Sequence, residues 1–263
     1  MALIKHEFPI LERDTEQTAI IMPNRKGLYK LPEKCVFAFL GDTTDKFAAE
    51  NQCEEIAVFE SITKNYPIYK IKYNGEDICF CQAPCGAPAA TQIVDFLISY
   101  GVRYIISCGS CGALHPFDEN AIIVPTSALR DEGTSYHYIE PKRIIDINPQ
   151  AVKAIKQVLD SRNISYRECR TWTTDGFYRE TKEMVKYRME EGCEVVDMEC
   201  SALAACAEFR GAVFGQILFT ADTLANLEEY DERDWGKSSY DIVLELSFEA
   251  VHLLGKDPLK LSM

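Results

Sequence analysis

Two acidic residues end apolar runs of the chain, at points where they could act on a bound substrate. Glu199 follows the run CEVVDM, just before a segment of small residues that is typical of a helix, and Asp222 closes the later run VFGQILFTAD. In the sheets of α/β proteins, ligands bind at the carboxyl ends of the strands. Paired carboxyl groups at that edge can bind substrate hydroxyls and donate a proton. Carboxylates at helix starts also serve simply as caps, which is the alternative interpretation.

A glycine-rich loop is the second feature with chemical potential. Gly109 and Ser110 open the sequence GSCGAL, directly after the apolar run YIISC. Because glycine carries no side chain, the backbone N–H groups of such a loop can come close to an anion. Tight glycine turns without a ligand are equally common, so the loop alone does not establish a phosphate site.

An aromatic segment follows another predicted strand. Phe177 and Tyr178 stand beside Arg179 in the sequence TWTTDGFYRET. An aromatic side chain at such a sheet edge can stack on a flat heterocycle, a contact that contributes roughly 1 to 3 kcal/mol in base-binding sites. Core packing is the commoner role of an aromatic residue, and it remains the alternative.

The elements that must position these residues have an α/β pattern. Short β-rich runs alternate with amphipathic stretches such as NPQAVKAIKQVLDSRN, which predicts strands alternating with helices. The runs YIISC and FGQILFTA lack strict polar alternation, as expected for strands that helices cover on both faces. We therefore expect a three-layer α/β/α fold, in one domain over residues 1–263, since no linker or repeat divides the chain.

The charge of the chain limits its partners. A formal net charge of −13 and an isoelectric point near 4.9 disfavour nucleic acid and anionic membrane surfaces, which would repel the average surface of the protein. Charges interrupt the apolar runs of the first residues, and no later run reaches the length of a membrane span. We expect a cytoplasmic protein that binds neither nucleic acid nor membrane.

The cysteines are numerous, but their pattern is that of core residues. There are 11 of them, an odd number, and most lie in apolar runs such as ICFCQ and ECSALAACA, which predicts reduced thiols. Cys108 and Cys111 form a CxxC pair. No second pair or histidine cluster completes a zinc-type ligand set, so no metal site is expected.

Taken in order, several segments resemble the nucleoside phosphorylase family, which includes purine nucleoside and uridine phosphorylases. They are GD at 41–42, YNGEDICFCQAPCGAP, IISCGSCGAL, RDEGTSYHY, WTTDGFYRET, VVDMEC and FTAD. The resemblance implies an α/β/α fold with a central mixed β-sheet. It also implies a homo-oligomer, hexamer or dimer, whose active sites are completed at subunit interfaces. Inorganic phosphate would be the co-substrate, with no further cofactor.

The resemblance assigns roles at the nucleoside end of the site. Glu199 matches the glutamate that accepts hydrogen bonds from the ribose, and Met198 the methionine that packs on the sugar. Phe177 matches the aromatic residue beside the base, and Asp222 the acid that protonates the leaving base in purine-specific members. These roles are physically consistent, because cleavage places positive charge on the sugar and negative charge on the base.

At the phosphate end the resemblance is incomplete. Gly41, Gly109 and Ser110 match phosphate-contacting positions, but two family arginines are replaced by Asp45 and Ser107. Lys64 falls near the place of an arginine that the neighbouring subunit contributes in the family. Each lost charge-assisted hydrogen bond is worth about 1.5 to 3 kcal/mol, so hydrolysis by water is an alternative to phosphorolysis. A nucleoside-binding protein without catalysis is less favoured, because binding alone needs no proton donor.

The base that the site would accept is the last question. A purine can be protonated on a ring nitrogen by Asp222, whereas uracil offers no equivalent position. The glutamine and arginine of uridine-specific members are replaced by Thr181 and Glu183, which favours purine nucleosides. The segment RDEGTSYHY looks more like the uridine branch, and Arg179 could act as a uracil ligand through its five donors. Uridine phosphorolysis therefore stays open as an alternative.

Overall fold

The computed structural model describes residues 3–24 and 26–256. Its strands are β1 Leu3–Ile4, β2 Arg13–Asp14, β3 Lys34–Ala38, β4 Glu54–Glu60, β5 Asn65–Tyr73, β6 Glu76–Gln82, β7 Tyr104–Ala113, β8 Ile122–Asp131, β9 Ile144–Asp146, β10 Tyr166–Thr174, β11 Cys193–Asp197 and β12 Val213–Thr223. Its α-helices are α1 Thr43–Glu50, α2 Ala87–Ser99, α3 Pro149–Ser161, α4 Lys182–Glu190, α5 Cys200–Arg210 and α6 Tyr240–Leu253. Short 3₁₀ helices are η1 Pro9–Leu11, η2 Thr134–His137, η3 Phe177–Arg179 and η4 Lys237–Ser239.

A mixed sheet forms the centre of the molecule. Its strands follow the order β11-β10-β8-β12-β7-β3-β6-β5-β4, and β9 pairs with β8. The pairs β3–β6, β3–β7, β7–β12, β8–β10 and β10–β11 are parallel, and the remaining pairs are antiparallel. Strand β11 also pairs with β7, with Val195 opposite Ala113. This extra pairing closes β7, β12, β8, β10 and β11 into a ring.

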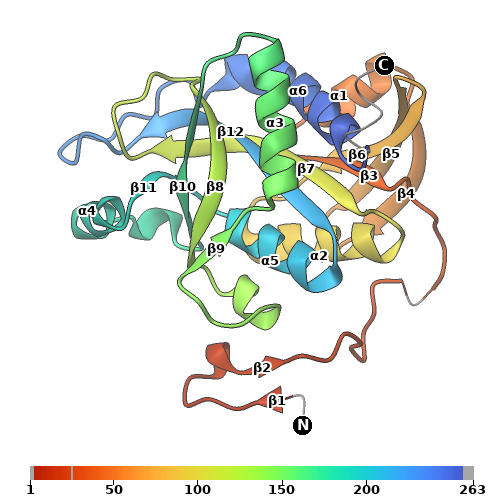
Figure 1. Cartoon of the computed structure of the whole chain (residues 1–263), viewed down its shortest axis with the longest axis horizontal. Coiled ribbons are helices and arrows are strands. Elements are labelled where there is room, and N and C mark those ends of the chain that lie inside the picture. Colours follow the sequence, from red (N-terminus) through yellow and green to blue (C-terminus); the bar gives the residue numbers. More distant parts are fainter. Residues whose placement is uncertain (1–2, 25, 257–263) are drawn as a thin grey trace.

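Helices cover both faces of the sheet (Figure 1). On one face α2 and α5 pack with Phe37 and Ile105, and on the other α1, α3 and α6 pack with Phe80 and Ile217. The structure therefore confirms the predicted three-layer α/β/α fold with a mixed central sheet. One domain over the whole of residues 1–263 stays a prediction.

Helix α3 shows how local sequence sets an element. The side chain of Asn148 accepts a hydrogen bond from the N–H of Gln150 at 2.9 Å, and Pro149 occupies the first turn. A capping asparagine followed by proline is a strong helix start. From there Ile155 and Leu159, four residues apart, are fully buried against the sheet. The helix predicted from NPQAVKAIKQVLDSRN is thus confirmed.

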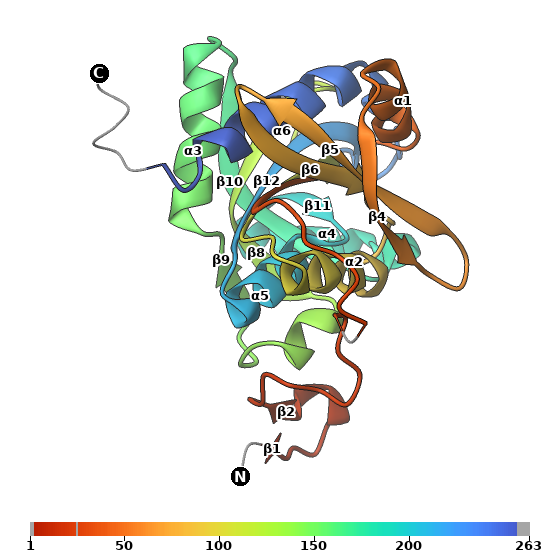
Figure 2. The ribbon, with the colours of Figure 1, turned by 90° about the vertical axis from the view of Figure 1, so that its right-hand side faces the viewer.

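The N-terminal segment lies apart from the three layers. Strands β1 and β2 form a small antiparallel hairpin that projects from the body of the molecule (Figures 1 and 2). Arg210 of α5 holds the segment by donating a hydrogen bond to the carbonyl oxygen of Gln17 at 2.6 Å. The sequence did not predict this hairpin.

Two further sequence features can be placed in the fold. All 11 cysteines are free thiols, and nine of them are buried, as their apolar surroundings predicted. Cys85 is the exposed exception. Within the described residues, no helix combines the length and the apolar composition that crossing a membrane requires.

Candidate active site

One cavity of about 830 Å³ opens at the ends of β3, β6, β7, β11 and β12. Carboxyl ends of parallel strands meet at one edge of a sheet, which explains why segments far apart in sequence converge here. The cavity brings together eight of the predicted site residues, and these are Gly41, Lys64, Gly109, Ser110, Phe177, Met198, Glu199 and Asp222.

Arg179 is the predicted site residue that the structure does not bring to the cavity. It is exposed and is not among the residues that line the cavity. Phe177 and Arg179 are the two ends of η3, and successive side chains of a 3₁₀ helix point about 120° apart. With Phe177 turned toward the cavity, Arg179 is turned away, so the structure gives no support to a role as a base ligand.

Asp197 is buried at the end of the cavity where the resemblance expects the sugar. Its carboxylate accepts hydrogen bonds from the hydroxyls of Thr171 and Thr173, each at 2.8 Å. It also accepts from the backbone N–H groups of Glu199 at 2.9 Å and Cys200 at 2.6 Å. Asp197 therefore caps the start of α5 and ties it to β10. Its position is structural, which matches the capping alternative for this segment.

Glu199 points into the cavity from this fixed helix start. Its carboxylate accepts a hydrogen bond from the backbone N–H of Gly86 at 2.5 Å, and only 7% of the residue is exposed. Burial, followed by the charge of Asp197, raises the pKa of Glu199 from 4.5 to about 8. Hydroxyls of a bound sugar would donate to this carboxyl group and favour its charged form.

Met198 and Cys85 flank Glu199 on the cavity wall. The sulfur atoms of Cys85 and Met198 are 3.9 Å apart. Burial, with a further contribution from Glu199, raises the pKa of Cys85 to about 11. At neutral pH Cys85 is thus a thiol, suited to packing rather than to nucleophilic attack.

The end of the cavity where the resemblance expects the base, called the base end below, holds a second pair of acids, Asp222 and Glu180. Asp222 is 5% exposed and accepts a hydrogen bond from the hydroxyl of Tyr230 at 3.1 Å. Burial raises the pKa of Asp222 above its ordinary value. Burial and the nearby Asp222 raise the pKa of Glu180 from 4.5 to about 8. The sequence interpretation missed Glu180, although it lies in the quoted segment WTTDGFYRET.

Two aromatic side chains border this base end. Phe177 was predicted from the sequence, whereas Trp235 was missed. Beyond these residues lies a second cavity of about 600 Å³. Phe177, Glu180, Asp222 and Trp235 line both cavities, so they surround the junction between them.

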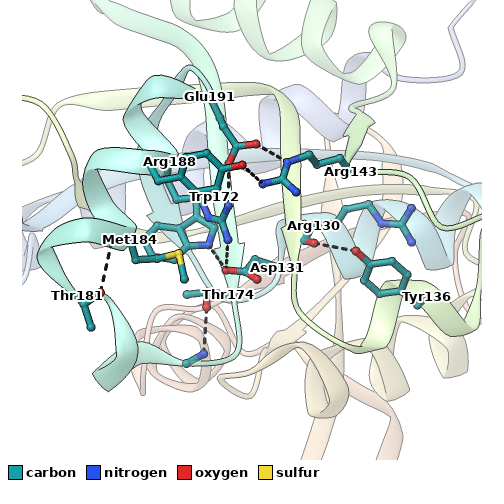
Figure 3. Close-up of polar contacts among 12 residues, drawn as sticks. Arg130, Asp131, Tyr136, Arg143, Trp172, Thr174, Thr181, Met184, Arg188 and Glu191 are labelled. Atoms are coloured by element: carbon teal, nitrogen blue, oxygen red, sulfur yellow. Dashed lines mark hydrogen bonds and ion pairs between the residues drawn. The ribbon is translucent and has the colours of Figure 1, made fainter. Parts of the chain in front are cut away.

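The segment that carries Phe177 and Glu180 runs between two anchored elements, β10 and α4. Figure 3 shows the ion-pair network behind it. The carboxylate of Asp131 accepts from the indole N–H of Trp172 and from the Arg188 guanidinium, both at 2.9 Å. Arg188 also pairs with Glu191 at 2.7 Å, and Glu191 pairs with Arg143. Because both ends are fixed, the short segment between them has little freedom to move the two site residues.

At the end of the cavity where the resemblance expects the acceptor, Gly41 lies in the turn between β3 and α1. Gly109 and Ser110 lie within strand β7, so the loop predicted at this point of GSCGAL is wrong. A β-carbon on Gly109 would lie 2.8 Å from the β-carbon of Phe39, so this position has no room for a side chain. Gly41 has a φ of 56°, in the region that favours glycine. The carbonyl oxygen of Gly41 accepts from the side chain of Gln82 at 2.7 Å, and Gln82 in turn accepts from the ammonium of Lys64. Lys64 thus reaches the cavity of its own subunit.

Asp45 and Ser107, which replace two arginines of the family, bring no positive charge to the expected acceptor end of the cavity. Asp45 is not among the lining residues and accepts a hydrogen bond from Tyr69 at 3.2 Å. Ser107 is fully buried and lies opposite Gln216 in the sheet. Neither the Ser107 hydroxyl nor the side-chain oxygen Oε1 of Gln216 has a hydrogen-bond partner among the described residues. Of the basic side chains in the described part of the chain, Lys64 alone lines the cavity.

Comparison with known proteins identifies the family to which this arrangement belongs. Residues 35–246 match the sequence profile of the phosphorylase superfamily. The chain belongs to the phosphorylase superfamily. This membership confirms the resemblance drawn from the sequence motifs, and the matched range contains all of the cavity residues described above.

Individual members of the superfamily are similar at low identity. A guanosine phosphorylase from Halorubrum lacusprofundi is 28% identical over 160 residues, which are 59% of this chain and 64% of the relative, somewhat less than two thirds of its length. A DeoD-type purine nucleoside phosphorylase from Bacillus cytotoxicus is 25% identical over 211 residues, 78% of this chain and 88% of the relative. The crystal structure of an AMP nucleosidase from Bacteroides thetaiotaomicron has a TM-score of 0.70 at 17% identity, covering 85% of this chain and 89% of the other. At this low identity, the similarity shows that the two proteins share a fold.

Proposed function

We propose that this superfamily member cleaves the N-glycosidic bond of purine nucleosides, with inorganic phosphate as the acceptor of the pentose. The observation that carries the proposal is the cavity that brings Glu199 and Asp222 together with Gly41, Gly109 and Ser110. Membership of the phosphorylase superfamily and the names of the two relatives agree with it. The proposal requires no metal or organic cofactor.

The chemistry follows from the charges that develop during cleavage. As the bond between the sugar C1′ and the base nitrogen lengthens, the sugar becomes positive and the base negative. The Glu199 carboxylate would accept hydrogen bonds from the ribose hydroxyls and stabilise the positive sugar. Burial raises the pKa of Asp222 above its ordinary value, and in its protonated form Asp222 would donate the proton to a ring nitrogen of the leaving base.

The acceptor completes the reaction from the opposite face of the sugar. A phosphate oxygen would form the new bond to C1′, which gives a pentose 1-phosphate and the free base. The Ser110 hydroxyl, the backbone near Gly41 and Gly109, and the ammonium of Lys64 are the groups that would hold the phosphate. A homo-oligomer, hexamer or dimer, with active sites completed at its interfaces stays a prediction.

Hydrolysis is the second candidate, and one observation favours it. Lys64 is the one basic side chain lining the cavity within the described residues, and its ammonium already contacts Gln82. Water needs no cationic site, so a cavity with a single basic side chain suits it better than it suits a phosphate dianion. The product would then be free pentose.

The experiment that separates the two candidates measures base release from adenosine and inosine with and without inorganic phosphate. Phosphorolysis requires phosphate and gives pentose 1-phosphate as the product. Undiminished base release in phosphate-free buffer, with free pentose as the product, would establish hydrolysis instead. The variant Lys64→Ala sharpens the assay, because loss of this cation would weaken phosphate binding and leave hydrolysis largely unchanged.

A further inference from the structure

Glu180 occupies the junction of the two cavities, together with Asp222, Phe177 and Trp235. Phe177 is partly buried and Trp235 is 38% exposed. Aromatic faces at the base end suit a flat heterocycle, which can stack on them. A base held there would have its edge within reach of the two carboxyl groups.

The carboxylate of Glu180 is available to a ligand. Within the described residues it has no hydrogen-bond or ion-pair partner, and the causes of its raised pKa are burial and the neighbouring Asp222. The cation closest to it in sequence on the second cavity, Lys182, is paired with Glu228. A partly buried carboxyl group without a protein partner gains most from a donor that the ligand brings.

The two acids differ in what they can do at the base. Asp222, holding the transferable proton, would donate to a ring nitrogen of the purine. Glu180, whose pKa of about 8 leaves it protonated in the empty site at neutral pH, would lose its proton when a ligand amine donates to it, because that hydrogen bond favours the ionised form. The ionised carboxylate accepts hydrogen bonds but donates none. The matching group on a purine is an exocyclic amine, such as the 6-amino group of adenine or the 2-amino group of guanine. Hypoxanthine has no exocyclic amine, and its carbonyl oxygen would be repelled by a carboxylate.

We propose that Glu180 is a specificity-determining residue that accepts a hydrogen bond from the exocyclic amine of the base, so that the site selects aminopurine nucleosides over inosine. This inference rests on the proposed cleavage of purine nucleosides and deepens it. Adenosine and guanosine share the chemistry that Glu180 recognises, and the assay distinguishes them.

The test compares kcat/KM for adenosine, guanosine and inosine in the wild type and in Glu180→Gln. Glutamine keeps the shape of the side chain but removes its charge, and its amide can donate to a carbonyl oxygen. Since hydrogen bonds to charged groups contribute about 1.5 to 3 kcal/mol, the preference for the better aminopurine over inosine should fall at least about tenfold. The aminopurine that loses more identifies the amine that Glu180 contacts.

Glu183→Gln is the matched control. Glu183 lies three residues further along, its side chain is 85% exposed and pairs with Lys186, and it lines neither cavity. This variant should keep the wild-type preference. An aminopurine-to-inosine ratio that is the same in Glu180→Gln and in the wild type would overturn the inference while leaving purine cleavage intact. A wild type that cleaves none of the three purine nucleosides would instead overturn the proposed function.

Discussion

The cavity contains two pairs of acids that are built in opposite ways. At the ribose end, Asp197 accepts four hydrogen bonds from β10 and from the start of α5, and Glu199 stands on this support. At the base end, Asp222 has one side-chain partner, Tyr230, and Glu180 has none within the described residues. The first pair lies at the end of β11 and the start of α5, whereas the second combines Asp222 of β12 with Glu180 in the short segment between η3 and α4.

This difference separates two tasks that a glycosidic-bond enzyme must perform. The sugar is the same in every nucleoside, so a rigid anchor suits it. The base varies between substrates and must receive a proton, so it is better served by acids whose protonation can respond to the ligand. Four experiments test whether the two pairs of acids differ in this way.

The largest effect is expected from Asp222→Asn, which removes the transferable proton with little change in shape. General acid catalysis typically contributes about 10² to 10⁴ in rate, so kcat/KM for adenosine and inosine should fall by about a thousandfold. Uridine, whose base has no equivalent nitrogen, should be affected much less. The assay compares the three nucleosides in wild type and variant. A uridine rate well above both purines and insensitive to the substitution would show that Asp222 is structural and that the purine assignment is wrong.

A smaller loss is expected from Glu199→Gln. Removing the charge near the positive sugar and weakening its hydrogen bonds should cost roughly 3 kcal/mol, which corresponds to a reduction of kcat/KM by about a hundredfold. The fold should be retained, because the capping contacts are made by Asp197. Circular dichroism would check the fold and steady-state kinetics the rate. A variant with nearly wild-type kinetics would remove Glu199 from the catalytic assignment.

Asp197→Asn should act on stability first. One carboxylate oxygen becomes an NH₂ group and must face either two hydroxyls or two N–H donors. Leaving buried groups badly paired costs about 1 to 3 kcal/mol, so the free energy of unfolding should fall by about that amount in urea denaturation. For the folded fraction, KM for the nucleoside should change little. An unchanged unfolding midpoint would mean that the α5 start does not depend on this cap.

The contrast between strand ends and loops also explains what could be predicted from the sequence. Glu199 and Asp222 stand at the ends of apolar runs, so local pattern was enough to place both at the ligand-binding edge. The layered fold followed in the same way. Glu180 and Arg179, in contrast, are adjacent residues of one short turn, and which of them faces the cavity depends on how η3 is held between β10 and α4. That packing is not encoded in a short motif.

Long-range contacts account for the other differences. Trp235 reaches the cavity from the loop after β12, and the closure of the ring by β11 and β7 joins residues about 80 positions apart. Neither leaves a periodic signal in the sequence. The resemblance placed Lys64 where a neighbouring subunit contributes an arginine in the family. In the structure Lys64 lies in the turn between β4 and β5 and lines the cavity of its own chain.

The smallest predicted effect concerns stability and pH, and it distinguishes the carboxyl groups most directly. In the folded protein the pKa of Glu199 is raised from 4.5 to about 8 by burial. Between these two values the unfolded chain releases the proton while the folded chain keeps it, so this group makes the protein less stable as pH rises toward about 8. Glutamine does not titrate. The difference in Tm between Glu199→Gln and the ligand-free wild type should therefore shift in favour of the variant, by several degrees, from about pH 5 to about pH 9. The Tm of Glu180→Gln relative to the wild type should shift in the same direction, since burial raises the pKa of Glu180 to about 8.

Asp197→Asn serves as the contrast, because its lost hydrogen bonds should lower Tm at both pH values. If the Tm difference for Glu199→Gln were independent of pH, Glu199 would already be ionised in the empty site, and the ribose end would be a preformed carboxylate that does not require substrate hydroxyls to charge it.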